Sequence, residues 1–530
     1  MKQLRYIFAS CILFFSSCSI LDIEPVSEWN AAAVPTEYNH VEAILYGGYQ
    51  RLGNVLLTGF IHYGDARADV YYANTTTAVT MDKIIHSHLE NELSQANWQN
   101  IYLVIKQANL NIHYIPNMIE SGAIKGSAKI DGTNTDLVES AYNILGQSYV
   151  MRAYTYFWMT RIWGGLPLLL DPIFSADEEE KMQLTRSSID QVFEQIYADL
   201  DEAERYLADS KGAVKNPTVF SYWAARGLRA HAYMWQHRYD DALPVLDDII
   251  ANGGYTLADL YDASLTLKDN GTSKSDPTRE AVNKSGFSKM FNTEGNSGSP
   301  ESIFELSFST ADGDTNNTFD SMWVSTAQVV IREDFINIFD NTFDFRYYAS
   351  IALKSSNKQR ATKFTRGYTK GDSRNVILMR LADLILLRAE ARLCAAEGEL
   401  TDADKTAIVA DLNQVINRAM GPSRQLVNTD EEEIGYQNFT KEEFFDRIKL
   451  ERRKELAFEG QRWFDLIRWG DVNKALGAMV PAELTTYVFD TGAIQLYEGD
   501  SFESGQLVWP IHLNEIRRSN GRIEQNEYYK

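Results

Sequence analysis

The stretch over residues 440–470 constrains the fold most, because it combines clear helix boundaries with an unusual pattern of charge. Thr440 and Glu443 have the spacing of a capping box, in which each side chain accepts a hydrogen bond from the other's backbone N–H. A helix should therefore begin there and run over residues 441–459, which contain neither Pro nor Gly. Gly460 lies where a left-handed glycine ends a helix, and a shorter helix should follow it.

Three carboxylates spaced by four residues give this stretch its unusual charge. Glu451, Glu455 and Glu459 would stack on one helical face, where like charges repel. Cations must therefore face them, and four arginines lie nearby in the sequence, interleaved with aromatic residues. These arginines are Arg452, Arg453, Arg462 and Arg468. The mixture predicts ion pairs packed against a hydrophobic core, where a half-satisfied pair would be costly.

The order of these residues resembles a known family pattern. Residues 451–469 read E-R-R-x-E-L-x-x-E-G-x-R-x-x-D-L-x-R-W, which resembles the C-terminal signature of the SusD/RagB family of outer-membrane lipoproteins. Further blocks with the same resemblance, in the family's order, occur at residues 18–25, 152–168, 303–308, 379–391 and 508–529. The resemblance implies a non-catalytic receptor without a cofactor. Such a receptor captures a glycan and delivers it to a SusC-like, TonB-dependent transporter.

The amino terminus predicts export and lipid anchoring. Two basic residues precede a short apolar run over residues 6–15, which is typical of a secretory signal and too short to span a bilayer. Cys18 follows Phe-Ser-Ser in the manner of a lipobox, whose cysteine is acylated. We therefore expect a lipoprotein signal peptide over residues 1–17 and a mature domain over residues 18–530. The alternative is an ordinary signal peptide with an incidental cysteine.

Composition narrows the class of ligand. The chain has 530 residues and a formal net charge of −22, so it does not match the cationic surface that nucleic acid requires. This charge leaves neutral and cationic ligands open.

Helical periodicity dominates about residues 36–252 and 379–470. Residues 221–252 read as two helices around a turn, with small residues at the crossing, and resemble a tetratricopeptide repeat. Such pairs cannot bury their apolar stripes alone, so neighbouring pairs must stack. The predicted fold is mainly α, a tetratricopeptide-like superhelix of helical pairs with a SusD-like insert. The other predicted helices are Tyr38–Leu52, Asn91–Tyr114, Leu137–Trp163, Ser187–Leu207, Arg380–Glu397 and Ala410–Met420.

The helical period fades over about residues 253–378, which we predict to be a loop-rich insert with a few short strands. Strands are expected near residues 303–308, 328–331 and 363–368. Long irregular inserts often carry binding groups. Trp323 lies in a polar setting there, and it is predicted either to stack on a ligand or to anchor the insert as a hydrophobic plug.

A second candidate binding segment lies at residues 65–77. Tyr71 and Tyr72 each combine an apolar ring face with a hydroxyl, which suits a sugar ring. Arg67, Asp69 and Asn74 could bind sugar hydroxyls. These five residues and Trp323 form the predicted ligand site. The alternative is a buried tyrosine beside a structural ion pair.

Other classes of function remain open at this stage. The cargo could be a peptide, as the RagB branch of the resemblance suggests, or the chain could be an interaction scaffold without a small ligand. The stacked glutamates could serve a lipoprotein glycosidase, but nearby arginines lower carboxyl pKa values, whereas a general acid needs a raised one. The histidines form no metal pattern, and the acidic loop over residues 312–314 leaves Ca²⁺ binding open.

Overall fold

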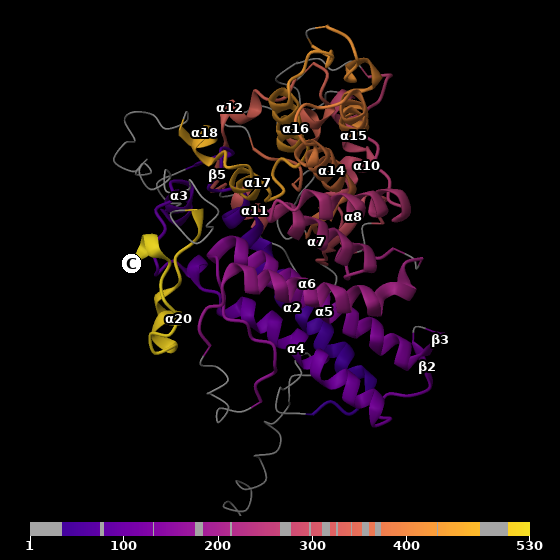
Figure 1. Cartoon of the computed structure of the whole chain (residues 1–530), viewed down its shortest axis with the longest axis vertical. Helices are drawn as coiled ribbons and strands as arrows, with labels where there is room; N and C mark the ends of the chain where they lie inside the picture. Colours follow the sequence, from indigo (N-terminus) through magenta and orange to yellow (C-terminus); the bar gives the residue numbers. More distant parts are fainter. Residues whose placement is uncertain are drawn as a thin grey trace, which may run out of the picture.

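The computed structural model describes residues 34–74, 79–130, 132–174, 184–212, 215–265, 277–295, 298–309, 318–324, 327–340, 342–351, 360–365, 373–431, 433–477 and 507–530. Within them the chain is mainly helical with a few short strands, as predicted. Figure 1 shows the long helices stacked in one direction, with the amino-terminal helices at the bottom and α14 to α16 toward the top.

The scaffold is a succession of neighbouring helices. α2 packs on α4, α4 on α5 and α5 on α6, and a second group continues through α7, α8, α14 and α15. This order confirms helical pairs that bury their apolar stripes against the next pair. The bounds are α2 Tyr38–Gly64, α4 Gln99–Glu120, α5 Leu137–Trp163, α6 Ile189–Leu207, α7 Tyr222–Trp235, α8 Tyr239–Asn252, α14 Leu381–Ala395, α15 Asp402–Met420, α16 Lys441–Glu455 and α17 Arg462–Trp469.

Side-chain caps fix several of these boundaries. The Thr440 side chain accepts a hydrogen bond from the Glu443 backbone N–H, and Glu443 returns the bond, so the predicted capping box of α16 is confirmed. Asp136 caps α5, which has the predicted bounds. α16 ends at Glu455, one turn before the prediction, because the chain turns through left-handed residues at Phe458 and Gly460.

Two amino-terminal helices differ from the sequence prediction. α2 continues past Leu52 to Gly64, because glycines inside it provide close packing and do not end it. A Cβ atom at Gly59, for example, would overlap the Trp158 ring. α4 begins at Gln99, whereas the prediction began at residue 91, because the preceding segment forms a short 3-10 turn, η1 (Ser94–Ala96).

The insert contains short strands that pair with distant segments. β4 (Ser302–Leu306) pairs antiparallel with β6 (Val376–Arg380), and β1 (Tyr71–Ala73) pairs with β5 (Val329–Ile331). The third predicted strand is wrong at its start, because residues 363–365 form a turn that directs Lys363 into the core. A separate hairpin joins β2 (Ser127–Ile130) and β3 (Thr133–Asp136).

Short helices complete the described part of the chain. They are α3 Val79–Ile85, α9 Pro277–Asn283, α10 Gly286–Met290, α11 Thr318–Trp323, α12 Glu333–Ile336, α13 Phe345–Ser350, α18 Val472–Gly477 and α20 Leu513–Arg518, with 3-10 turns η3 Ala208–Ser210, η4 Pro422–Arg424 and η7 Glu527–Tyr529. The carboxyl-terminal segment returns to the amino-terminal helices, since the Trp509 backbone N–H donates to the backbone carbonyl of Ile162 in α5. Among the described helices, none is both long and apolar enough to cross a membrane.

Candidate functional site

The three stacked carboxylates of α16 and the turn after it lie in the core. Glu451 and Glu455 are fully buried, and Glu459 is nearly so. Their cations come from distant parts of the chain. Arg346 of α13 contacts Glu451 at 3.0 Å, Arg380 of β6 contacts Glu455 at 2.7 Å, and Lys363 contacts Glu459 at 2.5 Å. Arg418 of α15 also pairs with Glu455. This buried ionic cluster therefore joins the insert to the helical scaffold.

The surrounding cations keep Glu451 and Glu455 ionised. Burial alone would raise the pKa of Glu455, but Arg418, Arg380 and Arg346 outweigh it, and the pKa lies well below its usual range. The pKa of Glu451 is also lowered, because Arg346 and Arg447 overcome the effect of burial. A glycosidase acid needs the opposite shift and an open site, so these residues do not provide one.

The four arginines that lie near the three stacked carboxylates in sequence form ion pairs with other acidic residues. Arg452 contacts Asp383 and Asp465 at 2.9 and 3.0 Å, and Arg468 contacts Glu390 at 2.8 Å. The prediction of ion pairs against a core is therefore confirmed, but proximity in sequence does not identify the partners. The reason is helical geometry, which points adjacent residues to different faces.

Arg67 and Asp69 are structural residues in this conformation. Asp69 is buried, accepts a hydrogen bond from Arg462 at 2.7 Å and forms an ion pair with Arg453 at 2.6 Å. Burial would raise its pKa, but the two arginines lower it overall. Arg67 is fully buried, with its guanidinium 4.2 Å from the Trp463 ring centre. Their burial contradicts the expectation that they bind sugar hydroxyls. Asp69 forms structural ion pairs with Arg462 and Arg453, and Arg67 donates to the Ser87 hydroxyl and the Leu507 carbonyl.

Tyr71 and Trp323 also lie inside the protein. Tyr71 is fully buried on the inner face of β1 and stacks on Phe458, with ring centres 6.0 Å apart. Trp323 is 2% exposed and stacks between insert residues, 5.7 Å from Phe319. Neither ring can stack on an external ligand, which corrects the prediction. Burial of Trp323 in an aromatic cluster with Phe319 and Phe364 is what the hydrophobic-plug alternative predicts.

Tyr72 is the predicted aromatic residue that the structure leaves on the surface. Alternation along β1 turns it away from Tyr71, and 46% of it is exposed. The Arg332 guanidinium lies 4.2 Å from its ring centre, which restrains the ring and covers one face. The exposed part of the Tyr72 side chain remains accessible to an apolar ligand surface.

Asn74 follows β1 on the same strand pair. Its side-chain amide donates to the Ala327 carbonyl at 2.5 Å, and its backbone N–H donates to the Gln328 carbonyl. Asn74 is therefore held at the end of the β1–β5 ribbon, two residues from Tyr72. The six predicted residues do not form one surface, and Tyr72 and Asn74 are those that remain near solvent.

Sequence reasoning missed Arg332. It follows the predicted strand over residues 328–331, and the antiparallel register places Val330 opposite Tyr72. A cation beside a strand that pairs with an exposed tyrosine is a useful signal, but the pairing of residues 71 and 331 could not be read from the sequence.

Several predictions lie outside the described residues. They concern the leader, Cys18 and the acidic loop over residues 312–314. In the described ranges, no group of three or more His, Cys, Asp or Glu side chains could hold a metal ion.

Comparison with known proteins places these observations in context. The profile of the SusD family, SusD_RagB, matches residues 358–529. A second profile, described as starch-binding and associating with the outer membrane, matches residues 58–234. A SusD-like protein of Formosa agariphila is 26% identical over the whole of both chains. A SusD-like protein of Bacteroides ovatus is 24% identical over 88% of this chain and 83% of its own.

Solved structures share the fold. A SusD homolog from Bacteroides thetaiotaomicron superposes with a TM-score of 0.68 at 19% identity, covering 94% of this chain and 98% of its own. A putative sugar binding protein from Bacteroides vulgatus gives 0.65 at 19% identity, covering 94% and 100%. At these identities the likeness establishes the arrangement of helices and insert, and it does not identify a ligand.

Proposed function

This chain belongs to the SusD/RagB family, and on that basis we propose that it captures a glycan at the outer membrane without catalysis. The glycan would pass to a SusC-like, TonB-dependent transporter. The lipid on Cys18 would hold the protein at the membrane, facing the cell exterior. The description of the matched profile as starch-binding and associating with the outer membrane supports the choice of ligand and place.

The observation that carries this proposal is the exposed ring of Tyr72 on a rigid ribbon. The ring is held by Arg332 on one face, so little conformational freedom is lost when a sugar stacks on its exposed part. Asn74 lies two residues away at the end of the ribbon, where it is partly exposed. Aromatic stacking beside a hydrogen-bonding side chain is suited to sugars, which have apolar faces and polar edges.

The inaccessible carboxylates favour capture over hydrolysis. Glu451 and Glu455 are sealed in the ionic cluster with lowered pKa values, so they cannot serve as the open acid–base pair that the glycosidase alternative requires. A peptide remains the second candidate for cargo, because a half-exposed tyrosine can also contact peptides. A combined glycan and peptide array on the chain from Ser19 separates the two.

We expect the Tyr72→Ala variant to bind the array-selected glycan about tenfold more weakly, because a lost stacking contact costs roughly 1.5 kcal/mol. Isothermal titration calorimetry measures this change. Tyr142→Ala is the matched control, since Tyr142 is a surface tyrosine of α5 that is 39% exposed. Equal affinity of Tyr72→Ala and the unmodified chain would place the glycan elsewhere.

The lipid anchor has its own test. Cys18→Ala should move the protein from the membrane fraction to the soluble fraction, because the acyl chains contribute ~0.8 kcal/mol per buried CH₂ group. Fractionation of cells that express either form, followed by immunoblotting, measures the distribution. A Cys394→Ala variant controls for loss of a thiol, and unchanged membrane retention of Cys18→Ala would contradict the anchor.

A further inference from the structure

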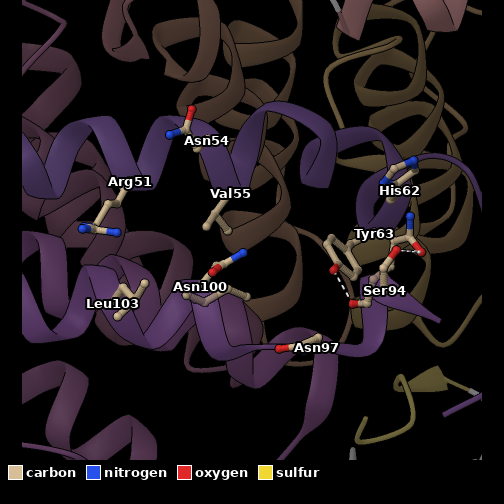
Figure 2. Close-up of a pocket in the computed structure, with 11 residues that line it drawn as sticks. Arg51, Asn54, Val55, His62, Tyr63, Ser94, Asn97, Asn100 and Leu103 are labelled. Atoms are coloured by element: carbon tan, nitrogen blue, oxygen red, sulfur yellow. Dashed lines mark hydrogen bonds between the residues drawn. The ribbon is translucent and has the colours of Figure 1, made fainter. Parts of the chain in front are cut away.

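A polar cleft lies between α2 and α4, on a part of the scaffold that the sequence analysis did not consider. Its volume is about 370 Å³. Small-ligand sites commonly occupy ~300–1,000 Å³. Figure 2 shows the two helices facing each other across the cleft, with Arg51 toward one end and His62 and Ser94 toward the other.

Side-chain amides line the middle of this cleft. Asn54 of α2 and Asn100 of α4 are exposed. Neither side chain forms a hydrogen bond with another residue that the structure describes. Asn97 accepts a bond from the Gln99 backbone N–H at 2.8 Å through its Oδ1 atom, so its amide donors remain for a ligand. Each amide combines donors with an acceptor, which matches the hydroxyl groups of a sugar.

His62 adds a buried polar group without a protein partner. It is 9% exposed, lines the cleft, and makes no hydrogen bond or ion pair within the described residues. Burial lowers the pKa of its imidazole to about 4, so the ring is neutral at physiological pH. A neutral imidazole offers one donor and one acceptor, which a ligand hydroxyl can engage in place of water.

The walls of the cleft are fixed before a ligand arrives. The Tyr63 hydroxyl donates to the Gln95 carbonyl at 2.5 Å, and the Tyr63 ring packs edge-on against Trp158 and Trp509. The hydrogen bond from Tyr63 to Gln95 holds η1 against α2. Val55 and Ile101 supply apolar surface between the polar groups, as Figure 2 shows for Val55. A preformed cleft loses little entropy on binding.

A second hollow meets this cleft at Asn54. It has a volume of about 580 Å³ and lies between α2 and the segment of β4, with Tyr46, Gln50 and Asn54 among its lining residues. These three residues follow one another at intervals of four on α2, so they form one exposed stripe. Tyr46 is 57% exposed. The stripe thus carries an aromatic ring and two amides between the two hollows.

We propose that the α2–α4 cleft and this stripe form a second binding surface for an oligosaccharide, separate from Tyr72. One sugar unit would occupy the cleft, bonded to Asn54, Asn100 and His62. The chain would continue across α2 and stack on Tyr46. This inference rests on the proposed function for the class of ligand, and it adds a subsite that prefers chains over single sugars.

Titration calorimetry with glucose, maltotriose and maltoheptaose, and with xylose and galacturonate oligomers of the same lengths, tests the proposal. We compare the chain from Ser19 with Asn54→Ala/Asn100→Ala, Tyr46→Ala and Tyr72→Ala. The matched control is Asn39→Ala/Asn117→Ala, which removes one exposed asparagine from each of the same two helices. The cleft double variant should lose at least tenfold in affinity for at least one series. Tyr46→Ala should weaken the longest oligomer at least threefold and leave the monosaccharide unchanged.

The variants separate this inference from the proposed function. If Tyr72→Ala loses affinity while the cleft double variant binds every oligomer as the unmodified chain does, the second surface is refuted and the first stands. The reverse pattern supports the cleft and refutes Tyr72. If the control double variant weakens binding as much as the cleft variant, or if no oligomer binds the unmodified chain, the second surface is refuted.

Discussion

Replacing Arg380 by alanine is expected to lower the free energy of unfolding by about 3–5 kcal/mol, because it leaves buried carboxylates without their cation. The guanidinium is 1% exposed and contacts Glu301, Glu455 and Glu459 at 2.6, 2.7 and 2.7 Å. It also donates to the Glu455 backbone carbonyl at 2.9 Å. Urea unfolding followed by tryptophan fluorescence measures the change, since Trp323 and Trp463 are buried in the native state.

The conservative variant makes this prediction more specific. Arg380→Lys keeps the charge but has three donors on one nitrogen, whereas Arg380 directs three nitrogens at different acceptors. We expect Arg380→Lys to recover less than half of the loss. Arg205→Ala is the control, because Arg205 pairs with Glu202 on the surface, where such pairs contribute at most ~1 kcal/mol. An Arg380→Ala loss no larger than the Arg205→Ala loss would contradict a structural role for the cluster.

The fold could be predicted from the sequence where local patterns decide it. α5 and the start of α16 were predicted correctly, because Asp136 and Thr440 have side chains that cap the next turn. The end of α2 was not predicted correctly, because Gly53 and Gly59 resemble helix breakers in the sequence. The aromatic rings that face them belong to distant segments. A Cβ atom at Gly53 would lie 3.7 Å from the Phe308 ring, and the sequence gives no sign that these two residues are neighbours.

The candidate site was harder to predict, because exposure depends on distant pairing. Tyr71 and Tyr72 are adjacent and chemically alike, and pairing of β1 with β5 determines which one is buried. Trp323 has polar neighbours in sequence but aromatic neighbours in space, among them Phe319 and Phe364. The α2–α4 cleft has no sequence signal, since Asn54 and Asn100 belong to separate helices whose contact is tertiary.

Gly460→Ala is expected to cost about 3–5 kcal/mol, which would make Gly460 the most sensitive glycine of the carboxyl-terminal signature. Two effects add together. Gly460 has a φ of 72°, which disfavours any residue with a Cβ atom. That atom would also overlap the backbone carbonyl of Phe60, at the end of α2. The Gly460 N–H donates to Asp65 at 2.9 Å, so movement of the backbone would also disturb this buried carboxylate.

Comparison with Gly470→Ala isolates the second effect, because Gly470→Ala carries only the first. Gly470 has a φ of 69°, nearly the same as Gly460, but a Cβ atom there would meet nothing within 4 Å. Its replacement should therefore cost only the conformational part, about 1–2 kcal/mol. The difference between the two variants in urea unfolding measures the close approach of α2 to the turn before α17. Equal losses would mean that this approach does not constrain the turn, and that backbone conformation alone explains the need for glycine at position 460.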